Sequence, residues 1–90
     1  MGEIRLKVRF HGRVQGVGFR YRAKYMAQSL GLTGWVRNEW DGSVSMEVQG
    51  RSQRIDKLLT GLNQDRYIRI DWMDSDEIPL KQERGFHISA

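Results

Sequence analysis

The sequence predicts an α+β fold in which two amphipathic helices cover one face of an antiparallel sheet. Several stretches alternate apolar and polar residues, which is the period of a strand with one buried face. Two other stretches repeat apolar residues at helical spacing, and each of them lies between predicted strands. Because every amphipathic element must bury its apolar side, all of them are expected to share one apolar layer.

The first predicted strand leads through a glycine-rich loop into a helix. Its core-facing residues are expected to be Ile4, Leu6, Val8 and Phe10. The residues expected to face water are Arg5, Lys7, Arg9 and His11. A helix is then predicted over residues 19–30, because its apolar residues recur every three or four positions, and Gly31 stands where helices often end in a left-handed residue.

An antiparallel hairpin is predicted next, from a strand over residues 33–39 to a strand over residues 43–49. Asp41 and Gly42 form a two-residue turn signal between them, because both residue types tolerate positive φ. In the second of these strands we expect Val44, Met46 and Val48 to point inward. The residues expected to point outward are Ser43, Ser45, Glu47 and Gln49.

The second half of the chain repeats the pattern of helix and strand. A helix is predicted over residues 52–63 and a strand over residues 68–73. A polar connection carrying Pro79 leads to a short last strand around residues 86–89. The order β-α-β-β-α-β predicts the split βαβ, or ferredoxin-like, sandwich with a short extra C-terminal strand.

Length and composition limit the classes of protein to consider. Ninety residues predict one domain, residues 1–90, and the absence of cysteine excludes disulfides and thiolate chemistry. No apolar run approaches the roughly 18 residues of a membrane span, so we expect a cytoplasmic protein without membrane contact. The net charge of +4 favours anionic ligands of any kind. No unpaired apolar stripe requires a second copy, which makes a monomer the expectation.

The segment from Gly12 to Arg20 is predicted to bind phosphate. Its glycines allow a sharp turn from strand to helix, and the first N–H groups of the helix have no partner inside it. Such a turn favours an anion, and the guanidinium of Arg20 matches two phosphate oxygens. The segment lacks the Lys-Ser/Thr ending of a Walker loop and contains no side chain that could form a covalent intermediate. If there is hydrolysis, water must attack directly.

Two motifs resemble those of the acylphosphatases. The run from Gly12 to Arg20 is similar to the first signature of the family, and the run from Gly34 to Asn38, followed by Asp41 to Val44 and Gly50, is similar to the second. The resemblance covers nearly the whole chain and implies hydrolysis of small acyl phosphates without a metal or cofactor. It implies catalytic roles for Arg20 and for Asn38, which would position the water. The phosphate-binding residues that it implies are Arg13, Val14, Gln15, Gly16, Val17, Gly18, Phe19 and Arg20.

Other interpretations stay open. Taken alone, the glycine loop is a tight connection without a ligand, and Asn38 is a turn residue. Trp35, Trp40 and Trp72, together with the basic first strand, suggest a nucleic-acid-binding module on a ferredoxin-like sheet, although the aromatic-rich motif for stacking bases is missing. A third alternative is a partner-dependent module that handles carbamoyl phosphate, like the acylphosphatase-like domain of larger hydrogenase-maturation proteins. We expect no nucleic-acid partner. His11 and His87 lack the spacing of metal ligands and are expected on the surface.

Overall fold

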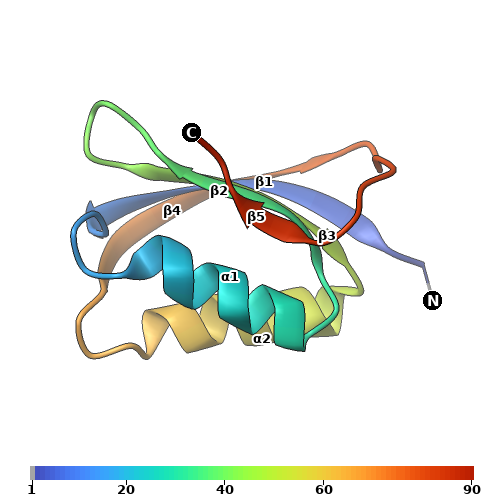
Figure 1. The fold of residues 1–90 in the computed structure, drawn as a ribbon, viewed down its shortest axis with the longest axis horizontal. Coiled ribbons are helices and arrows are strands. Elements are labelled where there is room, and N and C mark those ends of the chain that lie inside the picture. The colour runs from blue at the N-terminus through green and yellow to red at the C-terminus, as the bar shows by residue number, and fades with distance from the viewer. Residues whose placement is uncertain (1) are drawn as a thin grey trace.

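The computed structural model describes residues 2–90, so residue 1 of the predicted domain lies outside the described residues. The order of its elements confirms the predicted β-α-β-β-α-β arrangement with an added C-terminal strand (Figure 1). The elements are β1 (Ile4–Arg13), α1 (Phe19–Ser29), β2 (Thr33–Asn38), β3 (Val44–Gly50), α2 (Ser52–Asn63), β4 (Arg69–Ile78) and β5 (Phe86–Ile88). Neither described helix has the length and apolar character that a membrane crossing requires.

The five strands form one mixed sheet in the order β4-β1-β3-β2-β5. Four of them pair antiparallel, as predicted, but β5 runs parallel to β2, with Gly34 opposite Phe86. The predicted antiparallel sheet is confirmed for β1 to β4, and the added strand β5 makes the whole sheet mixed. The reason is the connection over residues 79–85, which carries the chain from β4 across to the far edge, so that β5 arrives in the direction of β2 (Figure 1).

Both helices lie on the same face of the sheet, and the core fills the space between the two layers (Figure 1). Val8 and Phe10 of β1 and Val36 of β2 are fully buried there, as the alternation predicts. Phe10 packs against Phe19 at the start of α1, with ring centroids 4.9 Å apart. The aromatic pair thus anchors the beginning of α1 to the end of β1, on either side of the glycine-rich loop.

The end of α1 confirms the predicted role of Gly31. This residue is left-handed, with φ of 69°, and its N–H donates to the carbonyl of Gln28. The N–H of Leu32 donates to the carbonyl of Ala27, which completes a Schellman motif. Leu32 is then buried beneath the helix end, and the chain enters β2 in the correct direction.

The hairpin between β2 and β3 has a three-residue turn instead of the predicted two-residue turn. The N–H of Glu39 donates to the carbonyl of Ser43, and the N–H of Gly42 donates to the carbonyl of Glu39. Only Gly42 has positive φ, at 93°, and Asp41 does not. The side chain of Asp41 accepts hydrogen bonds from the backbone and hydroxyl of Ser43, which favours this wider turn.

The face of the sheet opposite the helices is less open than the alternation predicts. Arg5, expected in water, is 1% exposed, and Ser43 and Ser45 are buried as well. Arg5 lies 3.0 Å from a carboxylate oxygen of Glu47 and 2.9 Å from one of Glu83. Arg5 is buried because Glu83, in the connection before β5, lies against β1 and covers the guanidinium.

Strand β4 is longer than predicted and continues to Ile78. Acidic residues assigned to a polar connection belong to this strand, where Asp74 lies opposite Arg9 and Asp76 opposite Lys7. Opposite charges across an antiparallel pair are favourable. The basic side chains of β1 therefore stabilise the acidic second half of β4 as a strand, although that half has no apolar alternation.

Candidate active site

The loop between β1 and α1 presents backbone N–H groups at one end of the sheet. Gly16 and Gly18 are left-handed, with φ of 73° and 80°, and Gly18 is the N-cap of α1. No side chain caps this helix and its first turn holds no acidic residue. The N-terminus of α1 therefore offers unsatisfied donors and the positive end of the helix dipole, a combination that binds anions.

Arg20 is the second residue of α1 and is half-buried. Within residues 2–90 it forms no ion pair with a carboxylate, whereas its neighbour Arg22 lies 2.7 Å from a carboxylate oxygen of Asp65. A cation in the first turn of a helix is unfavourable next to the helix dipole unless an anion joins it. Arg20 and the open N-terminus of α1 thus favour the same negatively charged ligand.

Asn38 is the last residue of β2 and lies opposite Val44 of β3. Because side chains alternate along a strand, Asn38 shares the helix-covered face with Val36 and Val44, both fully buried. Its side-chain oxygen Oδ1 is buried and has no hydrogen-bond partner within the described part of the chain. A buried amide oxygen without a partner costs free energy, so this atom is suited to accept a hydrogen bond from a water or ligand.

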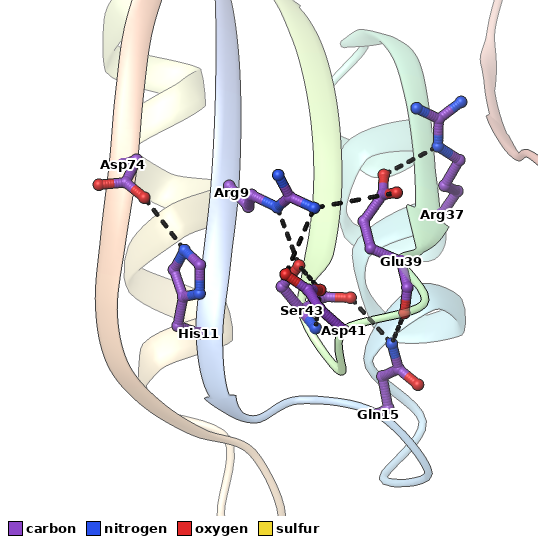
Figure 2. A network of polar contacts seen from close by, with 8 residues as sticks. All are labelled: Arg9, His11, Gln15, Arg37, Glu39, Asp41, Ser43 and Asp74. Carbon is purple, nitrogen blue, oxygen red and sulfur yellow. Dashed lines mark hydrogen bonds and ion pairs between the residues drawn. The ribbon is translucent and has the colours of Figure 1, made fainter.

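Gln15 connects the loop to the hairpin that follows Asn38. Its Nε2 donates to the carbonyl oxygen of Glu39 at 2.7 Å and to that of Ser43 at 2.9 Å (Figure 2). The loop is thereby held against the end of β2. Sequence reasoning placed Gln15 among the phosphate-binding residues, but its side-chain amide is engaged by the hairpin.

Polar side chains behind the hairpin were not predicted as part of the site. Figure 2 shows Arg9 of β1 reaching Ser43, Asp41 and Glu39, and Arg37 of β2 reaching Glu39, which lies two residues further along the chain. A hydrogen bond from Ser45, and then one from Arg37, lowers the pKa of Glu39. Hydrogen bonds from the Ser43 hydroxyl and backbone lower the pKa of Asp41. The register of the structure, with Arg9 opposite Ser45 and Ser45 opposite Arg37, places these side chains on one face.

The two histidines make their contacts outside the glycine-rich loop and the hairpin. The ring of His11 stacks on Trp72 with centroids 4.4 Å apart, and its Nε2 lies 3.0 Å from a carboxylate oxygen of Asp74. His11 is thus more covered than expected, whereas His87 is exposed. In residues 2–90, no group of three or more histidine or acidic residues is arranged to hold a metal ion.

Comparison with known proteins identifies the family. The family model described as acylphosphatase matches residues 6–88. The chain belongs to the acylphosphatase family. An acylphosphatase from Acaryochloris marina is 43% identical over 86 residues, which cover 94% of this chain and 92% of that protein. Acylphosphatases are hydrolases of acyl phosphates, and the family assignment supports this activity for the chain. The resemblance stated from the two sequence motifs is confirmed.

Solved structures support the same assignment. The crystal structure of the acylphosphatase from Bacillus subtilis superposes with a TM-score of 0.90 at 27% identity, covering 97% of this chain and 99% of that one. HypF of T. kodakarensis superposes with a TM-score of 0.83 at 29% identity, but this match covers 97% of the present chain and only 12% of HypF. The acylphosphatase fold therefore occurs both as a chain of this size and as a small part of a larger protein.

Proposed function

We propose that the chain hydrolyses the carboxyl-phosphate bond of small acyl phosphates by in-line attack of a water that Asn38 positions. In this proposal, residues 13–19 and Arg20 hold the phosphoryl group. The observation that carries it is that three groups lie on segments at the same end of the sheet: the uncapped N–H groups at the start of α1, the guanidinium of Arg20, which forms no ion pair within residues 2–90, and the buried Oδ1 atom of Asn38, which has no hydrogen-bond partner there. Hydrogen bonds from Gln15 connect the loop before α1 to the hairpin that follows Asn38.

The loop and Arg20 would stabilise the charge that spreads over the equatorial oxygens during phosphoryl transfer. Backbone N–H groups and a planar guanidinium supply fixed donors for those oxygens, and fixed donors need no reorganisation when the reaction occurs. Gly16 and Gly18 carry no Cβ, so the backbone can approach the phosphate closely. Binding and transition-state stabilisation would come from the same short segment.

Asn38 would act by orientation. Its amide oxygen accepts a hydrogen bond from the attacking water, which places a lone pair of the water opposite the leaving carboxylate. The bond from the water oxygen to phosphorus forms as the bond from phosphorus to the carboxylate oxygen breaks, and the proton of the water passes to phosphate or solvent. A carboxylate, with a pKa of about 4, leaves without a general acid. The proposed site accordingly uses no metal or organic cofactor.

A spectrophotometric assay with benzoyl phosphate in the presence of EDTA tests this function. We expect turnover of the wild type, and a loss of about 10²–10³ in kcat for Asn38→Ala, the usual cost of one preorganised polar group. The matched control is Asn63→Ala, which removes the same side chain from the exposed end of α2 and leaves kcat unchanged. Absence of wild-type turnover would refute the proposal. Normal turnover by folded Asn38→Ala would refute the role of Asn38.

The match to one part of HypF supports a second candidate that the sequence left open, a partner-dependent module, which we propose handles carbamoyl phosphate. Phosphate released from carbamoyl phosphate, measured directly because this substrate lacks the benzoyl chromophore, separates the two, since an independent hydrolase releases it without any partner. Nucleic-acid binding receives less support, since Arg5 and Arg9 on the open sheet face are already paired with carboxylates. Salt-sensitive binding of an oligonucleotide without hydrolysis would reverse this order.

The expectations about domain organisation, oligomeric state and location are part of the same proposal. We propose that residues 1–90 form one acylphosphatase-like domain that acts as a monomer in the cytoplasm. Light scattering coupled to size-exclusion chromatography measures the mass of the particle directly. A mass of twice the 10.5 kDa chain would refute the monomer.

A further inference from the structure

Arg9 holds the β2–β3 hairpin from the face of the sheet that the helices leave open (Figure 2). Its Nε donates to the hydroxyl oxygen of Ser43 at 2.9 Å. Its Nη2 lies 3.6 Å from Asp41 Oδ2 and 3.9 Å from Glu39 Oε1. One planar guanidinium therefore contacts three side chains of the short segment 39–43, which a single-point ammonium could not do in the same geometry.

The segment that Arg9 holds is internally well connected. The Ser43 hydroxyl donates to Asp41 Oδ1 at 2.6 Å, and the Ser43 N–H donates to the same atom at 3.0 Å. Glu39 also lies 2.9 Å from Nε of Arg37, through its other carboxylate oxygen. The low pKa values of Glu39 and Asp41 keep both carboxylates charged near neutral pH, so these contacts persist where an enzyme would work.

Asn38 lies in the chain between Arg37 and Glu39, two members of this network. Arg37 and Glu39, its neighbours, point to the open face and contact each other there (Figure 2). Asn38 points to the opposite face, towards the helices. A rotation of the strand about its axis would turn Asn38 as it turned its neighbours. Fixing residues 37 and 39 on one face therefore fixes the direction of the Asn38 amide on the other.

We propose that Arg9 is a positioning residue for hydrolysis, which sets the orientation of Asn38 through the hairpin without touching the substrate. This inference rests on the proposed role of Asn38 in holding the attacking water. Arg9 forms no hydrogen bond or ion pair with residues 13–20, and the loop meets the segment that Arg9 holds through Gln15, which binds backbone carbonyls instead of the side chains that Arg9 contacts. Loss of Arg9 lowers the rate of the chemical step and leaves substrate affinity as it was.

The test compares Arg9→Met in two backgrounds, because methionine keeps much of the apolar stem and removes the charged fork. We expect kcat to fall about tenfold in the wild-type background, less than the 10²-fold cost of a full 1 Å misplacement, with KM changed less than about twofold. In the Asn38→Ala background, kcat falls less than about twofold, because no positioned amide remains to be disturbed. Arg9→Lys restores part of the rate. Lys7→Met, on the same face of the same strand, is the matched control and behaves as wild type.

The other possible results distinguish a wrong role for Asn38 from a wrong role for Arg9. If Asn38→Ala retains the wild-type rate, the proposed role of Asn38 fails first, whatever Arg9 does. If Asn38→Ala is impaired and Arg9→Met matches Lys7→Met, only the inference on Arg9 is overturned. An equal loss in both backgrounds, or a rise in KM that accounts for the loss, overturns it as well. Should Arg9→Met not fold, Ser43→Ala removes the hydroxyl that Arg9 binds and is compared in the same two backgrounds.

Discussion

The side-chain amide of Gln15 lies 2.7 Å from the carbonyl oxygen of Glu39, and this hydrogen bond joins the glycine-rich loop to the strand that carries Asn38. The same Nε2 donates to the carbonyl of Ser43 on the other side of the turn. Both acceptors are backbone groups at the mouth of the hairpin. Gln15 thus sets the spacing between the two halves of the candidate site, although neither proposed catalytic side chain contacts it.

Replacing Gln15 by alanine is expected to impair both stability and catalysis. The carbonyls of Glu39 and Ser43 each lose one of two hydrogen bonds and keep the one from a backbone N–H, so the expected loss is about 0.5–1.5 kcal/mol for each bond removed. Because the loop is then free to move relative to Asn38, kcat should fall by about 10-fold or more. Urea denaturation and benzoyl phosphate kinetics measure the two effects. Gln28→Ala is the matched control, since its amide makes only one contact of 3.5 Å, to the carbonyl of Phe86. Equal behaviour of the two variants would contradict the role assigned to Gln15.

One half of the candidate site was predictable because it is encoded locally: glycines between an alternating strand and an apolar helix predict an exposed turn. Asn38, taken alone, predicts only a turn residue, and its place in the site was implied by the resemblance to the family. The structure agrees at the level of backbone, with Gly18 capping α1 and Asn38 ending β2. The catalytic roles of these residues stay predictions.

The contacts that join the halves were not predictable from periodicity. Whether Arg9 meets Ser43, or Gln15 meets the carbonyl of Glu39, depends on cross-strand register and on how the turn closes. Burial of Arg5 depends on a connection that returns from β4 with Glu83. Arg5 and Arg9 lie on an alternating strand and were expected in water, and distant segments contact both of them instead. Alternation identifies the two faces of a strand but not what later covers them.

Arg20 should be required for binding of inorganic phosphate, the product. Phosphate that binds the folded protein raises its Tm by mass action, in proportion to RT ln(1 + [L]/Kd). We expect this rise for the wild type and its loss in Arg20→Ala, while Arg20→Lys lowers kcat by about 10²-fold because the planar fork is lost. Differential scanning fluorimetry over a phosphate series provides the measurement.

Arg22→Ala is the matched control for that experiment. Arg22 lies two residues further along α1 but is paired with Asp65 at 2.7 Å. Its removal should lower Tm by the same amount with and without phosphate. A phosphate-dependent rise that survives in Arg20→Ala would mean that the anion binds elsewhere.

The hairpin carboxylates predict a loss of stability in acid. The folded-state pKa of Glu39 is lowered from 4.5, chiefly by the hydrogen bond from Ser45, and that of Asp41 is lowered from 3.8, chiefly by the hydroxyl of Ser43. A lowered pKa contributes stability above the unfolded-state value, and this contribution disappears as pH falls through the folded-state value. Glu39→Gln should therefore be less stable than the wild type at pH 7, and the difference should shrink below about pH 4.5.

Urea denaturation at a series of pH values between 7 and 3 measures this difference. Glu77→Gln is the control, because Glu77 is an exposed residue of the edge strand β4 and forms no ion pair within the described residues 2–90. A constant difference between Glu39→Gln and the wild type across the whole series would show that the Glu39 charge contributes nothing to the folded state.

Gly12 is expected to tolerate no side chain, because it lies where β1 shifts its register against β4 just before the loop. Its φ is 133°, and a Cβ there would lie 2.3 Å from the carbonyl oxygen of Arg69 and 2.8 Å from the backbone nitrogen of Asp71. Since both neighbours are backbone atoms of a paired strand, Gly12→Ala must part β1 from β4 or distort the bulge. We expect a loss of about 3 kcal/mol or more in the free energy of unfolding, from strain and overpacking together.

Gly85→Ala is the control with φ of 70° and no heavy atom within 4 Å of the added Cβ, so only the left-handed strain of about 1–2 kcal/mol applies. Urea denaturation measures the free energy of unfolding of both variants. Equal losses would mean that β4 shifts to accommodate the added methyl group, and that the close contact at Gly12 does not fix the position where the loop begins.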